Sequence, residues 1–272
     1  MCNECLSLNR CGSILDGFFS EMFNPEPQWV SPPADFDIND NEVHLWQACL
    51  EQPCSRIQEL EQLLCLAEKS RAEKFVFAQH RRHFIAGRGF LRRILGGYLN
   101  QPATSLEFSY GPQGKPELVS PSVHDKLYFN VSHSHEIVLY AISRNRQVGV
   151  DVEYLRAKQD VENIAQRYFY PDECEVIASL SAERKTAAFF KAWTVKEAYA
   201  KATGEGLAVL EQVETSLSQD GPAALLSVHG NPGAMLRWSS CQIYPSPGYM
   251  AALVVEGESW NLQCVMHNPG IE

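Results

Sequence analysis

The feature that most constrains the fold is a strongly β-forming run over residues 137–152, which ends in alternating apolar and acidic residues. Residues 149–153 read G-V-D-V-E. On a strand, side chains two residues apart project from the same face about 7 Å apart, so Asp151 and Glu153 share one face. Uncompensated carboxylates would be costly if this strand is buried, and a bound cation would offset that cost.

A third carboxylate lies on a predicted helix over residues 182–203, which Gly204 ends. Glu197 and Lys201 are four residues apart and fall on one face of this helix. Glu197 joins the strand carboxylates only if the helix packs against that strand. The apolar residues that could hold it there are Phe189, Phe190, Trp193 and Val195. Taken singly, the strand acids are ordinarily a solvated face, and Glu197 with Lys201 is ordinarily an i,i+4 ion pair. The occurrence of both patterns in one chain favours a divalent-cation site.

Four motifs in sequence resemble the Sfp-type 4′-phosphopantetheinyl transferases. They are G-K-P at 114–116, N-V-S-H-S at 130–134, G-V-D-V-E at 149–153, and W-T-V-K-E-A-Y-A-K at 193–201 with a G-E-G exit at 204–206. They follow the family's order at similar distances. The resemblance implies an α+β fold of two similar halves related by a pseudo-twofold axis, with the active site between them. No sequence repeat links the halves, so this symmetry is implied by the resemblance alone.

The element pattern predicts an extension and two halves. Residues 1–41 are predicted to be an appended amphipathic helix, near 14–23, and a Pro- and Asp-rich linker. The predicted N-terminal α+β half, 42–147, has strands at 42–50, 106–109, 127–132 and 137–143 and helices at 55–69 and 79–99. The predicted C-terminal half, 148–272, carries the metal and catalytic motifs. It begins with the strand 147–153, and later strands are predicted at 212–217, 224–228, 236–244 and 249–255. Its two predicted helices are 182–203 and one entered at Pro171-Asp172, with Glu175 three residues after the Asp cap.

The resemblance also implies a reaction. A member of this family moves the 4′-phosphopantetheine arm of coenzyme A onto a serine of a carrier protein, converting apo to holo carrier. Asp151, Glu153 and Glu197 match its ligands for Mg²⁺, with Mn²⁺ as the alternative. Glu197 is also the candidate general base, and the sequence leaves open whether Glu197 or a bound water takes the serine proton. Lys201 matches the lysine that contacts the diphosphate and stabilises the leaving group.

Further residues match positions that contact coenzyme A in the family. They are Arg71, Lys74, Gly114, Lys115, Asn130, Ser132, His133, Lys196 and Lys201. Arg71 is expected at the 3′-phosphate and Lys115 at the nucleotide end, whereas Lys196 would flank the site. Residues 110–113 place no arginine ahead of the G-K-P motif, which departs from the family pattern. Arg88, Arg92 and Arg93 have no firm match and are interpreted as surface residues or as contacts for an acidic carrier.

The composition limits which partners and which cellular compartment are expected. A net charge of −10 argues against general nucleic-acid binding, but residues 71–93 hold seven Lys or Arg against one acid, which suggests an anionic ligand. Nine cysteines without a secretory signal predict free thiols in a reducing, cytoplasmic setting. No apolar run is long enough to cross a bilayer. We therefore expect no membrane contacts, and we also expect a monomer.

Two other functions are alternatives to the transferase. A magnesium-dependent nucleotide or phosphodiester hydrolase would suit three carboxylates and a lysine, but the chain lacks both G-x-x-x-x-G-K-[ST] and G-x-G-x-x-G. A catalytically inactive carrier-binding module is disfavoured because Lys201 and all three carboxylates are present. The implied partners are carrier proteins or domains of fatty-acid, polyketide or nonribosomal-peptide synthesis, and the sequence does not choose among them.

Overall fold

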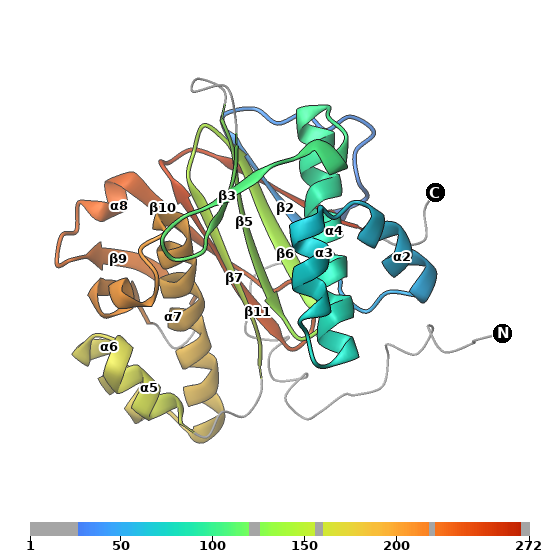
Figure 1. The fold of residues 1–272 in the computed structure, drawn as a ribbon. Helices are drawn as coiled ribbons and strands as arrows, with labels where there is room; N and C mark the ends of the chain where they lie inside the picture. The colour runs from blue at the N-terminus through green and yellow to red at the C-terminus, as the bar shows by residue number, and fades with distance from the viewer. Residues whose placement is uncertain (1–26, 120–125, 156–159, 218–220, 268–272) are drawn as a thin grey trace.

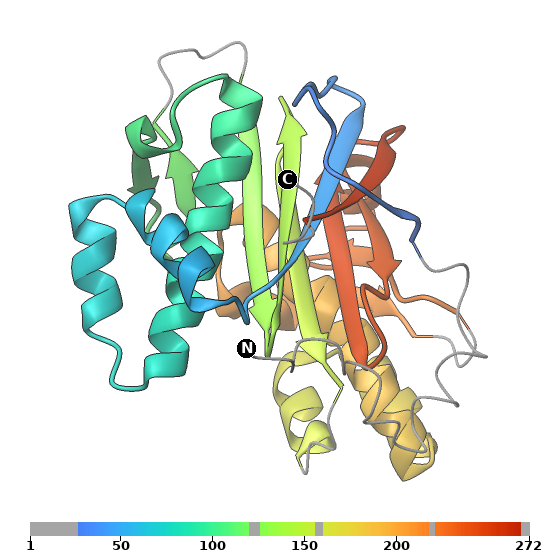
Figure 2. The same cartoon turned by 90° about the vertical axis from the view of Figure 1, so that its right-hand side faces the viewer.

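The computed structural model describes residues 27–119, 126–155, 160–217 and 221–267. In this part of the chain, two sheets pack face to face, and a long helix covers the outer face of each (Figure 1 and Figure 2). The mixture of helices and largely antiparallel strands confirms the predicted α+β class. The pseudo-twofold relation between the halves stays a prediction, and the predicted helix near 14–23 lies outside the described residues.

The larger sheet draws on both ends of the described chain. Its order is β1-β12-β2-β6-β5. The strands are β1 (Trp29–Val30), β2 (Glu42–Cys49), β5 (Leu127–Ser134), β6 (Ile137–Arg144) and β12 (Asn261–Met266). Strands β2, β6 and β5 are antiparallel, whereas β12 lies parallel between β1 and β2. The sequence pattern did not predict β12, which brings the last described strand back to the sheet of the N-terminal half.

Helices from the N-terminal half cover the outer face of this sheet. They are α2 (Cys54–Gln62), α3 (Leu66–Glu73) and α4 (Ala78–Leu99). Trp46, Tyr140 and Phe90 are buried in the core beneath them. The prediction of a single helix over 55–69 is wrong. The helix breaks before α3, where the Cys65 N–H donates to Glu68 Oε2 over 2.9 Å and begins a new helix.

The smaller sheet has the order β10-β11-β7 and carries the acidic strand at one edge. Its antiparallel strands are β7 (Val148–Tyr154), β10 (Trp238–Ile243) and β11 (Tyr249–Glu256), and α7 (Ala182–Thr203) crosses its outer face. Helix α7 comes so close to β7 that a Cβ atom on Gly149 would lie 2.0 Å from the Ala198 carbonyl oxygen. Glycine at 149 therefore permits the packing that the acidic cluster requires.

Shorter elements complete the described structure. They are η1 (Ala103–Ser105), the hairpin β3 (Phe108–Tyr110) and β4 (Pro116–Leu118), α5 (Val161–Tyr168), α6 (Pro171–Ser179), η2 (Leu207–Gln212), β8 (Val213–Ser216), β9 (Ala224–Val228) and α8 (Ala234–Arg237). The predicted cap of α6 is wrong. Pro171 occupies the first helical position, so Tyr170 is the cap residue, and its N–H donates to Glu173 Oε2 over 2.7 Å.

Candidate active site

Strands β5 and β7 meet along a junction made by side chains. On β5, Asn130, Ser132 and Ser134 alternate on the face toward β7. Their side-chain oxygens accept the backbone N–H groups of Val150, Val152 and Tyr154 at 2.9, 3.2 and 3.0 Å. These hydrogen bonds take the place of a backbone ladder and join the two sheets. They set the strand that carries the acidic residues against the N-V-S-H-S motif.

The acidic residues of β7 face this junction and α7. Asp151 is only 4% exposed, and its Oδ1 accepts hydrogen bonds from Ser132 Oγ at 3.0 Å and from Lys201 Nζ at 2.6 Å. Lys201 Nζ also donates to Ser132 Oγ at 2.9 Å. Two residues further along both strands, Ser134 Oγ donates to Glu153 Oε2 at 3.3 Å. Helix α7 thus packs on the strand as the sequence analysis required, and it brings Glu197 and Lys201 to the carboxylates of β7.

Glu197 lies in an environment that disfavours its negative charge. Burial, reinforced by repulsion from Asp151 and Glu153 and opposed by Lys201, raises the pKa of Glu197 to about 7. A carboxyl group with such a pKa exchanges a proton readily near neutral pH, which suits a general base.

The donor atoms of this cluster fit a hard divalent cation. Asp151 Oδ2 is buried and has no hydrogen-bond partner among the described residues, so a cation would satisfy it. As arranged, no group of three or more His, Cys, Asp or Glu side chains in the described ranges is close enough to hold a metal ion. Lys201 instead supplies the positive charge beside Asp151.

A cavity of about 860 Å³ opens on the other side of β5. Because strand side chains alternate, Val131 and His133 point into it while Ser132 points to the acidic cluster. The predicted site residues Arg71, Gly114 and His133 are all in its lining. The lining also includes residues that were not predicted for the site, among them His80, His83, Arg88 and Tyr110. The basic stretch 71–93 was the available signal for the first three.

Lys115 connects the β3–β4 hairpin to the C-terminal half. Its Nζ donates to the Ala202 carbonyl oxygen in the last turn of α7, over 2.6 Å. Burial is the main reason that the pKa of Lys115 falls to about 8. The hairpin therefore bridges the two halves beside the cavity.

Of the predicted cofactor contacts, Lys196 and Lys74 lie away from both the cavity and the β5–β7 junction. Lys196 is fully buried, pairs with Glu173 Oε2 at 2.8 Å and donates to the Val213 carbonyl. The structure thus places Lys196 in the packing of α7 against α6 and β8, which contradicts its assignment as a coenzyme A contact. Lys74 is exposed at the end of α3, outside the cavity lining.

Two arginines that have no firm match in the family pattern are not surface residues. Arg92 is 1% exposed and donates to Glu68 Oε2 at 2.6 Å, so its interpretation as a surface residue or carrier contact is wrong. Arg88 is largely buried and lines the cavity.

Comparison with known proteins gives consistent matches over most of the chain. The model of the 4′-phosphopantetheinyl transferase superfamily matches residues 147–254, and the model of the N-terminal part of 4′-phosphopantetheinyl transferases matches residues 45–145. The chain is 42% identical over 232 residues to 4′-phosphopantetheinyl transferase HetI of Nostoc sp., covering 85% of this chain and 95% of that relative. It is 33% identical over 172 residues to 4′-phosphopantetheinyl transferase psf-1 of Bacillus pumilus, covering 62% and 71% of the two chains.

Two further findings complete the comparison. The solved holo-[acyl-carrier-protein] synthase of Thermotoga maritima shares 26% identity, covers 41% of this chain and 63% of that chain, and superposes with a TM-score of 0.32. Among the described residues, every helix is too short or too polar to cross a bilayer.

Proposed function

The chain belongs to the 4′-phosphopantetheinyl transferase superfamily, and from this premise we propose that it loads carrier proteins from coenzyme A. The group transferred is the 4′-phosphopantetheine arm, and the acceptor is a serine hydroxyl of an acyl or peptidyl carrier. The main structural support is the position of the acidic cluster beside the cavity, separated only by strand β5. Ser132 touches Asp151 and Lys201, while the next residue, His133, lines the cavity. A volume of about 860 Å³ suits a cofactor-sized ligand.

In the proposed reaction, the serine oxygen attacks the phosphorus that carries the pantetheine arm. The bond from this phosphorus to the bridging oxygen breaks, and adenosine 3′,5′-bisphosphate leaves. We assign the serine proton to Glu197, because its pKa of about 7 lets it accept a proton near neutral pH. Lys201, four residues along the same helix, is assigned to balance the charge that develops on the leaving phosphate.

We assign Asp151, Glu153 and Glu197 as the residues that would hold Mg²⁺, or Mn²⁺ in its place. The buried, unpartnered Oδ2 of Asp151 and the oxygen-only donor set support this assignment. When bound, the ion supplies Lewis-acid stabilisation of negative charge on the diphosphate. A carboxylate that binds metal is a weaker base, so the two roles of Glu197 compete.

The nucleotide end of coenzyme A is assigned to the cavity. Arg71 is proposed to pair with the 3′-phosphate through its planar guanidinium, and Gly114 and His133 to contact the rest of the cofactor. Lys115 is outside this lining but follows Gly114 directly, and it is proposed to contact the nucleotide from the hairpin. Burial is the main cause that lowers the pKa of His133, and the charges of Lys201 and His83 add to it. His133 is therefore assigned as a neutral hydrogen-bonding group at this end.

The test is the intact mass of a purified apo acyl carrier protein after incubation with this protein, coenzyme A and Mg²⁺. We expect a gain of one phosphopantetheine that disappears with EDTA and with Asp151→Ala. A parallel reaction without carrier distinguishes the hydrolase, which would release adenosine 3′,5′-bisphosphate from coenzyme A alone. No mass gain on several unrelated apo carriers would contradict the proposal.

A further inference from the structure

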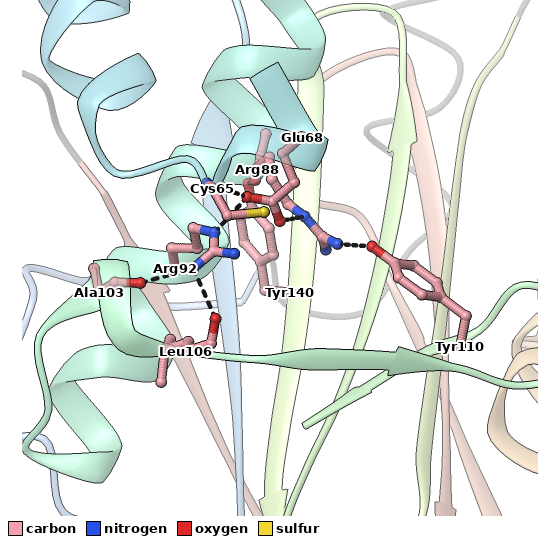
Figure 3. Close-up of polar contacts among 9 residues, drawn as sticks. Cys65, Glu68, Arg88, Arg92, Ala103, Leu106, Tyr110 and Tyr140 are labelled. Atoms are coloured by element: carbon pink, nitrogen blue, oxygen red, sulfur yellow. Dashed lines mark hydrogen bonds and ion pairs between the residues drawn. The ribbon is translucent and has the colours of Figure 1, made fainter. Parts of the chain in front are cut away.

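Arg88 joins three elements (Figure 3), and it is one of the residues that line the cavity. From α4, its Nε donates to Glu68 Oε1 on α3 over 2.5 Å, and its Nη2 donates to the hydroxyl of Tyr110 on β3. The guanidinium carbon also lies 4.4 Å from the centre of the Phe108 ring. The planar guanidinium therefore fixes both a carboxylate and the strand that leads into the β3–β4 hairpin.

The charges of Arg88, Arg92 and Glu68 do not balance. Glu68 is 6% exposed and accepts hydrogen bonds from both Arg88 and Arg92, so one carboxylate serves two guanidinium groups. Arg92 is turned away from the cavity and donates to the carbonyl oxygens of Ala103 and Leu106 at 2.9 and 3.0 Å. Arg88 is the member that lines the cavity, so the surplus positive charge lies at the ligand volume.

The hairpin that Arg88 secures spans both halves. Figure 1 shows β3 and its loop reaching across the sheets from the side of α4 to that of α7. Tyr110 ends β3 beside Arg88, and the tip that follows carries Gly114 and Lys115. At the far side, Lys115 Nζ donates to the Ala202 carbonyl oxygen. The hairpin is thus held at one end through Arg88 and at the other through α7.

We propose that Arg88 is a positioning residue for the nucleotide end of coenzyme A, fixing the β3–β4 hairpin through Glu68 and Tyr110 and adding positive charge to the cavity wall. The inference rests on the proposed function, because it takes coenzyme A as the ligand. Within the described ranges, the contacts of Arg88 are with Glu68, Tyr110 and the Phe108 ring, on the cavity side of β5 and away from Asp151 and Lys201. Its loss should therefore weaken binding of the nucleotide and leave the chemical step unchanged.

The experiment compares Arg88→Gln with Arg81→Gln. Arg81 lies on the same helix, its side chain is 44% exposed, it pairs with Glu61 at 3.2 Å, and it is outside the cavity lining. Calorimetry measures the binding of coenzyme A, adenosine 3′,5′-bisphosphate and 4′-phosphopantetheine. Arg88→Gln should raise the Kd of coenzyme A and the Kd of adenosine 3′,5′-bisphosphate by the same factor, about tenfold. The Kd of 4′-phosphopantetheine should stay within about twofold of the wild-type value. The kcat at saturating coenzyme A should stay within about twofold, and Arg81→Gln should match the wild type.

Tyr110→Phe is the second variant, because it removes a single hydroxyl from a half-exposed ring and leaves Glu68 paired. It should weaken nucleotide binding about threefold. Arg88→Gln also leaves Glu68 paired with Arg92, which protects the fold. Equal weakening for all three ligands, a loss confined to kcat, or identical affinities in Arg88→Gln and Arg81→Gln would overturn the inference. A wild type that binds none of the three ligands would instead overturn the proposed function.

Discussion

Single residues at the β5–β7 junction serve both the fold and the site. The Ser132 hydroxyl accepts the Val152 N–H, which joins the strands, and donates to Asp151, which orients a carboxylate. The same oxygen accepts a hydrogen bond from Lys201 on α7. Because three elements converge on one hydroxyl, the positions of the strand, the carboxylate and the lysine depend on one another.

Removing the charge of Glu197 should separate activity from stability. Glu197→Gln should lower carrier loading by about 10²-fold to 10⁴-fold, since the assigned base is lost. The melting temperature in EDTA should stay equal or rise, because burial and repulsion from Asp151 disfavour the native carboxylate. Mass spectrometry of the carrier and thermal unfolding measure the two effects. Glu205→Gln, which changes an exposed carboxylate near the end of the same helix, is the control. Near-normal turnover in Glu197→Gln would refute the assignment.

Lys115 should make coenzyme A binding depend on pH. The pKa of its ammonium is about 8, so the group is charged below pH 8 and progressively neutral above it. A neutral lysine attracts phosphate less, and the KM for coenzyme A should therefore rise between pH 7 and pH 9. Lys115→Arg keeps its charge over this range and should flatten the profile. Parallel profiles for the two proteins would show that the ammonium of Lys115 does not contribute.

The contact between α7 and β7 depends on a single glycine. A Cβ atom on residue 149 would lie 2.0 Å from the Ala198 carbonyl oxygen and 2.4 Å from the Ala202 nitrogen, both backbone atoms. Gly149→Ala should therefore move the helix off the strand and lower the free energy of unfolding by about 3 kcal/mol or more. Transfer should fall with it, because Glu197 and Lys201 move away from Asp151.

Urea denaturation with Gly111→Ala as the control checks this prediction. A Cβ atom on Gly111 would meet nothing closer than 3.8 Å, so that variant should stay within about 1 kcal/mol of the wild type. Equal stability of the two variants would show that α7 can adjust to an alanine at 149 without cost.

Elements specified by local sequence were predictable. The bounds predicted for α7, 182–203, are those of the structure, and Gly204 has the left-handed φ of 78° that a helix end favours. Strand β12 was missed because its partners β1 and β2 lie more than 200 residues earlier in the chain. Local patterns carry no information about such pairing.

The same distinction applies to the site. The period-2 acids of β7 and the i,i+4 pair of α7 indicated the cluster, because strand and helix geometry fix which side chains share a face. Lys196 was misassigned since its partner Glu173 reaches it only through the packing of α6. Arg92 was misassigned for the same reason, because Glu68 comes to it from α3. Tertiary contacts decide whether a charged residue faces a ligand or the core.

Across the whole molecule, three connections join the halves. Side chains of β5 bind the backbone of β7, and β12 returns from the C-terminal half to pair with β2. The β3–β4 hairpin adds a third link through Lys115. Because Ser132 from one half contacts Asp151 and Lys201 from the other, any separation of the halves would dismantle the acidic cluster. We therefore expect the halves to unfold together.

Removing β12 tests this expectation. A chain that ends at residue 260 loses the buried side chains of Cys264 and Val265 and the parallel partner of β2. At about 1.5 to 3 kcal/mol for a buried Val, and a similar amount for the smaller Cys264 and the partly buried Leu262 together, the cost should reach about 3 to 6 kcal/mol. A matched chain that ends at residue 267 keeps β12 and should retain wild-type stability. Hydrogen exchange in low urea should show β6 and β11 losing protection together in the shorter chain, because both depend on one global opening. If β11 kept its protection while β6 lost it, the C-terminal half would be stable alone, and the connections across the junction would be weaker than their geometry implies.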